Sequence, residues 1–275
     1  MASVNTNVGA MVALQNLNKT NSQLQTVQNR INTGLAVSSA KDNGGIYAIA
    51  QNMRSEVGGL RAVTNSLDLA VSSVDVALAA GDAVSDLLVE MKEKALAASD
   101  VSLDSASRTA LNEDFKALRD QISTIVENAE FNGTNLIDGT NSDGISALAN
   151  AKGTNTIAVA SEDMSLSGDV LSLSAGMEIS TASDGTAAVT AIETALTNLN
   201  SALSRLGTGS KSLEIHKTFV GKLSDSLETG IGNLVDADLA KESAKLQSLQ
   251  VKQQLGIQAL SIANSAPSTV LGFFR

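Results

Sequence analysis

The 275-residue chain contains no cysteine and no tryptophan, and it has one proline and one tyrosine. Without cysteine it forms no disulfide and offers no thiolate for nucleophilic chemistry or metal binding. Aromatic residues make up 2% of the chain although its hydrophobic content is 43%. Because large rings usually fill a thick core, this composition favours thin layers of helix and an elongated molecule. The single proline, Pro267, leaves long stretches without a helix breaker.

The chain also has few charges near its ends. Residues 1–40 contain Lys19 and Arg30 and no acid, residues 235–275 carry a net charge of +1, and the whole chain carries −10. Residues 41–234 therefore carry −13. A general nucleic-acid binder needs a basic face, so we expect no nucleic-acid partner. Weakly charged ends and an acidic middle fit ends that become buried and a middle that repels neighbouring assemblies.

No apolar run approaches the roughly 18 residues of a membrane-spanning helix. The first residues also lack the positive segment and the apolar run of a secretory signal. We therefore expect no membrane contact, and we expect an extracellular form to be secreted without a cleaved signal peptide.

Apolar residues at steps of three and four predict helices along most of the chain. The longest stripe runs from Ile46 to Ala95, about seven heptads, and predicts a helix on the order of 80 Å long. A short break at 99–104 precedes a third stripe, from Leu111 to Ala129, and Phe131-Asn132-Gly133 predicts a turn. Helical spacing resumes at Val189.

Residues 140–185 differ from the rest because glycine and Asn/Asp clusters separate short alternating runs. The runs 164–166 and 170–173 predict small β-hairpins. The predicted fold class is therefore mainly α: a long antiparallel helical bundle or coiled coil with paired terminal helices and a small β-hairpin insert. The chain would run out along one axis, turn at the insert and return, which places both termini together.

The terminal helices carry amides where exposed helices usually carry charges. Amides can hydrogen-bond in a packed interface without the cost of burying a charge. A pair of two such helices still exposes more apolar surface than monomers tolerate. We therefore expect the ends to be loosely ordered in the monomer and to fold against copies of the same chain, and open head-to-tail contacts grow as a helical filament. The candidate subunit interface consists of Val4, Val8, Met11, Leu14, Leu17, Leu24, Val27, Ile31, Leu239, Leu246, Leu249, Ile257, Leu260, Phe273, Phe274 and Arg275.

Residue types that often carry chemistry favour structural roles here. His216 is the only histidine and has no nucleophile at matching spacing. The stretch 207–211 lacks the spacing of a phosphate loop, and we interpret it as a small-residue patch where two helices approach closely. Asp236 and Asp238 are interpreted as capping and first-turn charges. We therefore predict no catalytic, cofactor or metal site and no enzymatic activity.

Three groups of residues resemble bacterial flagellin, the subunit of the flagellar filament, in its short forms. The N-terminal group consists of residues 30–34, 40–42 and 48–49, and the central one of residues 131–133 with 136–137. The C-terminal group consists of residues 233–238, 253–254, Pro267 and 271–275. The resemblance implies that residues 1–40 and 235–275 line the filament core, 41–139 and 186–234 form a helical rod, and 140–185 form a surface insert.

The resemblance also implies partners: further copies of the chain, sister flagellins, a flagellar export chaperone, and the filament cap and junction proteins. It implies type III export and a role in swimming motility. Glu90 and Lys94 replace residues that the family usually presents to an innate immune receptor, so we expect that recognition to be weak. Asn18 and Asn132 begin glycosylation sequons, which in a bacterial protein are mostly chance.

Three other functions fit the sequence less well. A hook–filament junction protein shares similar ends, and the terminus 273–275 favours the filament subunit over it. An extracellular coiled-coil adhesin would need an anchor or a binding head, and residues 140–185 offer neither. An enzyme would need a cluster of catalytic residues, and the sequence has none.

Deleting residues 1–40 tests the role of the ends. We expect the remaining chain to be soluble and folded by circular dichroism, because the helical middle carries its own apolar stripes. We expect it to form no filaments in electron micrographs, because half of the paired ends is missing. Fibres of normal appearance from this truncation would contradict the prediction.

Overall fold

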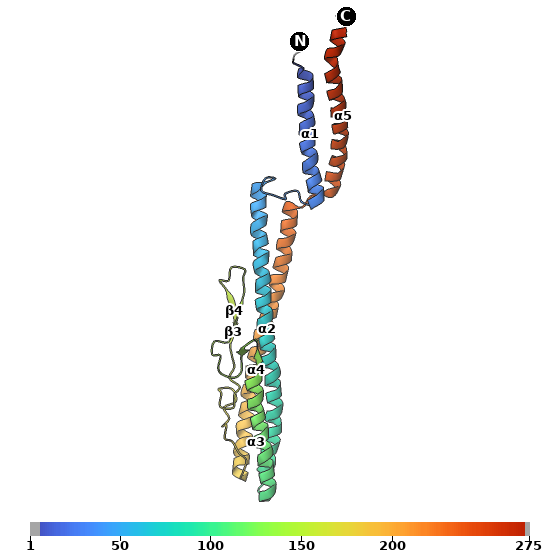
Figure 1. Ribbon diagram of the computed structural model, residues 1–275. Helices are drawn as coiled ribbons and strands as arrows, with labels where there is room; N and C mark the ends of the chain where they lie inside the picture. The colour runs from blue at the N-terminus through green and yellow to red at the C-terminus, as the bar shows by residue number, and fades with distance from the viewer. Residues whose placement is uncertain (1–5, 273–275) are drawn as a thin grey trace. The chain divides into compact units, whose positions relative to one another are not determined.

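The computed structural model describes residues 6–272, and the side chains of residues 6–265. This part of the chain contains five helices and four short strands: α1 (Val8–Thr33), α2 (Gly44–Ala98), α3 (Ser105–Asn128), β1 (Glu130–Phe131), β2 (Thr134–Asn135), β3 (Ile145–Leu148), β4 (Thr156–Val159), α4 (Ala182–Val235) and α5 (Leu239–Gly272). The predicted fold class and order of elements are confirmed (Figure 1). The chain divides into two compact units, Met1–Ser55 with Ser226–Arg275, and Glu56–Asp225.

In the first unit, α1 and α5 lie side by side and antiparallel, so the terminal helices are paired as predicted (Figure 1). The Asn7 side chain accepts a hydrogen bond from the Ala10 backbone N–H at 3.0 Å and caps the start of α1. Gly34 ends the helix in the left-handed conformation, with φ of 72°, which only glycine adopts without strain. Gly34 is therefore the C-terminal cap of α1.

The chain segments that follow α1 and precede α5 bridge to each other. Leu35 and Asp236 form an isolated antiparallel bridge. The Ala36 N–H donates to the Val235 carbonyl at 2.7 Å, and the Ala237 N–H donates to the Gly34 carbonyl at 2.8 Å. These backbone bonds join residues about 200 positions apart in the sequence. They lie directly after α1 and directly before α5, so they fix the end of α1 next to the start of α5.

In the second unit, α2, α3 and α4 form a helical bundle (Figure 1). Lys92 of α2 pairs with Glu193 of α4 at 2.8 Å, and Lys94 of α2 pairs with Asp114 of α3 at 2.9 Å. The largest fully buried side chains of the three helices are Leu67, Leu88, Met91, Phe115, Ile122, Ile192 and Leu199. The predicted break at 99–104 is confirmed, and Asp104 ends it by capping α3 through the Ser107 N–H. Hydrogen bonds from Ser107 lower the pKa of Asp104.

Two hairpins follow α3. In the first, β1 pairs with β2 across Asn132-Gly133, the predicted turn, where both residues have positive φ angles of 51° and 80°. That conformation matches the turn that suits the twist of paired strands, and it explains the Asn-Gly sequence. In the second, β3 pairs with β4 over four residues.

The prediction of hairpins at 164–166 and 170–173 is wrong, because residues 160–181 form turns and bends and contain no strand. Their apolar side chains are nonetheless buried: Met164, Leu166, Val170, Leu171 and Leu173. Local hydrogen bonds replace a ladder, for example from the Met164 N–H to the Ile137 carbonyl at 2.8 Å. The alternation in sequence therefore reflects turns that direct apolar side chains inward. The helix α4 also begins earlier than predicted, at Ala182.

Gly185 tests how tightly α4 packs against the end of α2. A Cβ atom at Gly185 would lie 2.8 Å from the Ser99 backbone nitrogen and 2.9 Å from the Ala95 carbonyl oxygen, and backbone atoms cannot move aside easily. Gly185→Ala should therefore lower the free energy of unfolding by about 1–3 kcal/mol in urea titrations.

Gly221 supplies the control for this substitution. It lies in the same helix with nothing within 4 Å of its added Cβ. Gly221→Ala should leave the unfolding free energy unchanged or raise it by up to about 1 kcal/mol, because alanine is the better helix former. Equal stability of the two variants would contradict the close approach.

Candidate assembly interface on the terminal helices

Part of the predicted interface stripe is used within the chain, where α1 packs against α5. Leu24, Val27 and Leu249 are buried, and Ile31 and Leu246 pack against them. Farther along the pair, a Cβ atom at Gly256 would lie 3.3 Å from the Leu17 side chain. These residues hold the two helices together and do not form a free surface in the single molecule.

Amides from the uncharged ends extend the same contact. The Gln253 side-chain N–H donates to the Asn21 side-chain oxygen at 2.8 Å. The Asn7 side-chain N–H donates to the Ala263 carbonyl at 2.6 Å. This is the role that the amide-rich sequence suggested, because the helices exchange hydrogen bonds with no charge buried.

One ion pair joins α1 and α5, and the sequence pattern did not predict it. The Arg30 Nη1 lies 3.0 Å from Glu242 Oε1, and Glu242 is only 9% exposed. Arg30 lies in the last turn of α1 and Glu242 in the first turn of α5, so each charge is favourable to its helix end. One feature of the sequence could have indicated this pair: Arg30 is one of only two charged residues among the first 40.

The rest of the stripe is exposed. Val8 and Met11 are each 63% exposed, and Leu14, Leu239 and Ile257 are about half exposed. Leu17 and Leu260 are partly buried. The structure adds four exposed apolar residues that the stripe missed: Val12, Val251, Leu255 and Ile262. Val4, Phe273, Phe274 and Arg275 lie outside the described residues.

Exposed and buried apolar residues alternate around α5. Leu249 is 3% exposed, whereas Val251 and Leu255 are 55% and 57% exposed. Two residues advance a helix by about 200°, so these side chains leave it on different sides. One partner helix can cover only one of these sides. The apolar surface left over is of the kind that marks protein–protein contact sites.

The residues with possible chemistry have structural roles. The His216 Nε2 lies 2.8 Å from the Ala149 carbonyl, and its ring stacks at a tilt on Phe219 with centroids 5.8 Å apart. Asp238 caps α5 by accepting the Lys241 N–H at 3.0 Å, as predicted. Asp236, in contrast, lies before α5 in the bridge to Leu35, and the acid of the first turn is Glu242.

The small-residue patch at 207–211 has a different neighbour from the one predicted. A Cβ atom at Gly209 would lie 2.8 Å from the Val159 side chain, so the glycine makes room for strand β4. The prediction of two closely approaching helices is therefore wrong at this glycine. At Gly207 an added Cβ would meet nothing within 4 Å.

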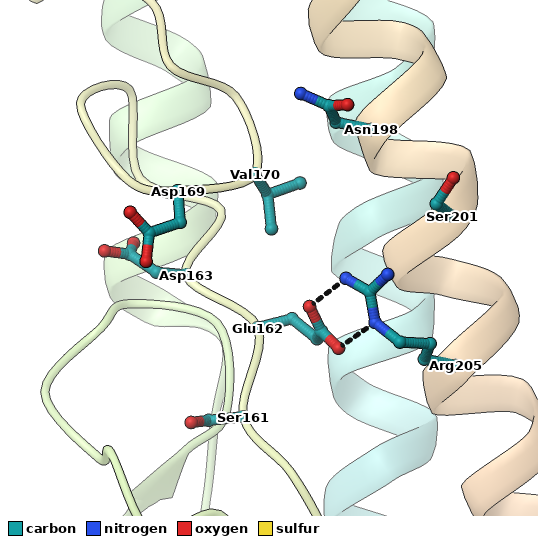
Figure 2. A pocket seen from close by; sticks show the side chains of 8 residues that line it. All are labelled: Ser161, Glu162, Asp163, Asp169, Val170, Asn198, Ser201 and Arg205. Carbon is teal, nitrogen blue, oxygen red and sulfur yellow. Dashed lines mark hydrogen bonds and ion pairs between the residues drawn. The ribbon is translucent and has the colours of Figure 1, made fainter.

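A polar hollow of about 290 Å³ lies between α4 and the loop after β4 (Figure 2). Arg205 donates two hydrogen bonds to the Glu162 carboxylate across it, from Nε to Oε1 at 2.6 Å and from Nη2 to Oε2 at 2.5 Å. These bonds raise the pKa of Arg205. The pair ties the loop to the helix. Among the described residues, no three His, Cys, Asp or Glu side chains gather into a metal site, and no helix is apolar enough to span a membrane.

The fold is thus one of long helices whose paired ends leave apolar side chains uncovered, and it is of the kind found in structural proteins. Residues 4–142 match the N-terminal helical region of bacterial flagellin, and residues 189–274 match its C-terminal helical region. The chain belongs to the bacterial flagellin family, and it is a structural subunit of the extracellular flagellar filament, which serves motility.

Individual relatives agree over the full length. The chain is 55% identical to flagellin FljM of Caulobacter vibrioides over 273 residues, which cover 99% of this chain and 98% of that protein. It is 37% identical to a flagellin of Brucella melitensis over the whole of both chains. Among solved structures it is similar to a proposed flagellar hook-associated protein of Vibrio parahaemolyticus, with a TM-score of 0.60 and 15% identity over 71% of this chain and 100% of that one. The last likeness shows the fold alone.

The Arg30–Glu242 pair can be tested by a double-mutant cycle. Arg30→Ala leaves the buried Glu242 carboxylate without its partner, and Glu242→Ala leaves the guanidinium without its own. Each single substitution should weaken filaments by about 1–3 kcal/mol per subunit, measured from the critical concentration for growth, because Arg30 is partly exposed. The double variant should lose less than the sum of the two.

Lys245→Ala, at an exposed position of the same helix, is the control and should change little. Additive losses in the cycle would show that the two residues do not act together.

Proposed function

We propose that the exposed apolar faces of α1 and α5 are the surfaces through which neighbouring subunits contact one another in the filament. The exposure of Val8, Met11, Val251 and Ile257 on already paired helices supports this proposal. Burying one such side chain fully contributes about 1.5–3 kcal/mol. Several of them, repeated in every copy, are enough to drive association once neighbours lie on both sides.

We propose further that the chain is arranged in the filament in three parts. Residues 1–40 and 235–275 form the core around the channel, residues 41–139 and 186–234 form the rod, and residues 140–185 form the outer surface. The low charge of both ends and the net charge of −13 between them support this arrangement. The terminal helices order fully when they pack against further copies.

The remaining partners follow from the same function. We propose that an export chaperone binds the C-terminal segment before assembly, that a cap protein receives the subunit at the growing tip, and that junction proteins join the filament base. Secretion takes place without a cleaved signal peptide. The chain has no enzymatic role, and its family is one of structural proteins. No observation favours a junction protein over a filament subunit.

Replacing exposed apolar residues of α1 tests the proposal. Met11→Gln with Leu14→Gln should leave the helical content of the monomer unchanged, because both side chains are about half exposed or more. The critical concentration for filament growth should rise on the order of tenfold or more, since each half-exposed side chain still gains roughly half of the 1.5–3 kcal/mol of full burial.

Val101→Gln serves as the control. Val101 is 87% exposed in the turn between α2 and α3, away from the terminal helices in sequence. It should assemble like the unmodified chain. If the α1 variant also assembled like the unmodified chain, these faces would not be the subunit contacts.

A further inference from the structure

The outward face of α2 in the second unit is acidic and partly apolar. Five exposed acids lie at steps of three, four and seven along it and so share one side of the helix: Asp75, Asp82, Asp86, Glu90 and Glu93. Val89 and Leu96 lie beside them, 46% and 60% exposed. The five acids and two apolar residues are called the acidic face.

Among the described residues, no base forms an ion pair with the acidic face; Asp114 first, and then Glu90 and Glu93, raise the pKa of Lys94. The two lysines of this part of α2, Lys92 and Lys94, turn to the sides of the helix, where they pair with Glu193 and Asp114. None of the five acids forms an ion pair with another described residue. In this part of α2 the two lysines are therefore turned toward α3 and α4, whereas the five acids are exposed.

The outward face of α4 has the opposite character. Lys211, Ile215, Phe219 and Lys222 lie at steps of three and four on one side of the helix, and all four are exposed. Ile215 is 61% and Phe219 is 55% exposed, and Phe219 is the only exposed phenylalanine among residues 6–265. Lys211 and Lys222 make no ion pair with a described residue. These four residues are called the basic face.

The two faces are displaced along the bundle. Lys217 pairs with Asp68, and Lys92 pairs with Glu193, so α2 and α4 run antiparallel in a fixed register. In that register the middle of the basic face lies opposite Asp68, whereas the middle of the acidic face lies near Asp86. The separation is about 18 residues, or about 27 Å at 1.5 Å per residue. Neither face can therefore cover the other within one molecule.

We propose that the basic face of one subunit docks on the acidic face of a second copy. The two surfaces are complementary in charge, and each carries two exposed apolar side chains for the centre of the contact. They are different surfaces, so the contact is head-to-tail and leaves a free face of each kind for the next copy in an open helical array. Neighbouring copies joined in this way are staggered by about 27 Å. The contact is separate from that of the terminal helices and adds to it.

A charge swap in the full-length chain tests the docking. Lys211→Glu with Lys222→Glu places acids opposite acids, and the critical concentration for filament growth in 50 mM salt should rise about tenfold. Adding Asp82→Lys and Asp86→Lys restores opposite charges and the original net charge, and growth should recover to within about threefold of the unmodified chain. The defect should shrink in 0.5 M salt, where charges are screened within about 5 Å.

Two controls separate docking from net charge and from misfolding. Lys211→Gln with Lys222→Gln changes the net charge by −2, and Lys152→Glu in the β3–β4 loop changes it by the same amount. Only the double variant at Lys211 and Lys222 should impair growth. Circular dichroism melting should match the unmodified chain for every variant, because all these side chains are exposed.

Two results would overturn the docking. In the first, the fourfold variant with Asp82→Lys and Asp86→Lys grows no better than the variant with Lys211→Glu and Lys222→Glu alone. In the second, Lys152→Glu impairs growth as much as Lys211→Gln with Lys222→Gln. Because the substitutions leave α1 and α5 intact, that result would not touch the proposed role of the terminal helices.

Discussion

The structure depends on one constraint. When apolar side chains project from several sides of a helix, a single partner helix cannot cover all of them. The pair of α1 and α5 buries Leu24, Val27 and Leu249 and leaves Met11, Val251 and Ile257 exposed. Water penalises that surface by about 25 cal/mol for each Å², and only additional helices can remove it. This uncovered surface is the basis of our proposal that neighbouring subunits in the filament complete the packing of the terminal helices.

Other features of the chain serve the same constraint. Lysine and glutamate on the terminal helices would make burial of these helices costly. The terminal helices carry amides instead, and these form hydrogen bonds between α1 and α5, as Gln253 does with Asn21. The one ion pair between the helices, Arg30–Glu242, lies at their bridged end, where the backbones also bond. Register is therefore fixed at this end by charge and backbone, while the apolar faces remain available to neighbours. The second unit carries the acidic face on α2 and the basic face on α4, which we propose to meet between adjacent copies.

Much of this fold follows from periodicity alone. Steps of three and four predicted α1 to α5 in order, and Phe131-Asn132-Gly133 predicted the turn at which Asn132 and Gly133 have positive φ. That Gly34 caps α1 was not predicted from the sequence. Alternation misled at 164–173, because turns can bury every second or third side chain as a strand does. The stripe on α5 was incomplete because it assumed one apolar face, and Val251 and Leu255 lie outside it. The Arg30–Glu242 pair joins residues 212 positions apart, and no local pattern reports such a contact.

Hydrogen exchange, compared between the monomer and the filament, tests the central claim most directly. If neighbouring copies complete the packing of the ends, backbone amides of 8–33 and 239–265 should gain large protection on assembly, whereas those of α3 should change little. Equal protection of the terminal helices in the monomer and in the filament would contradict the account.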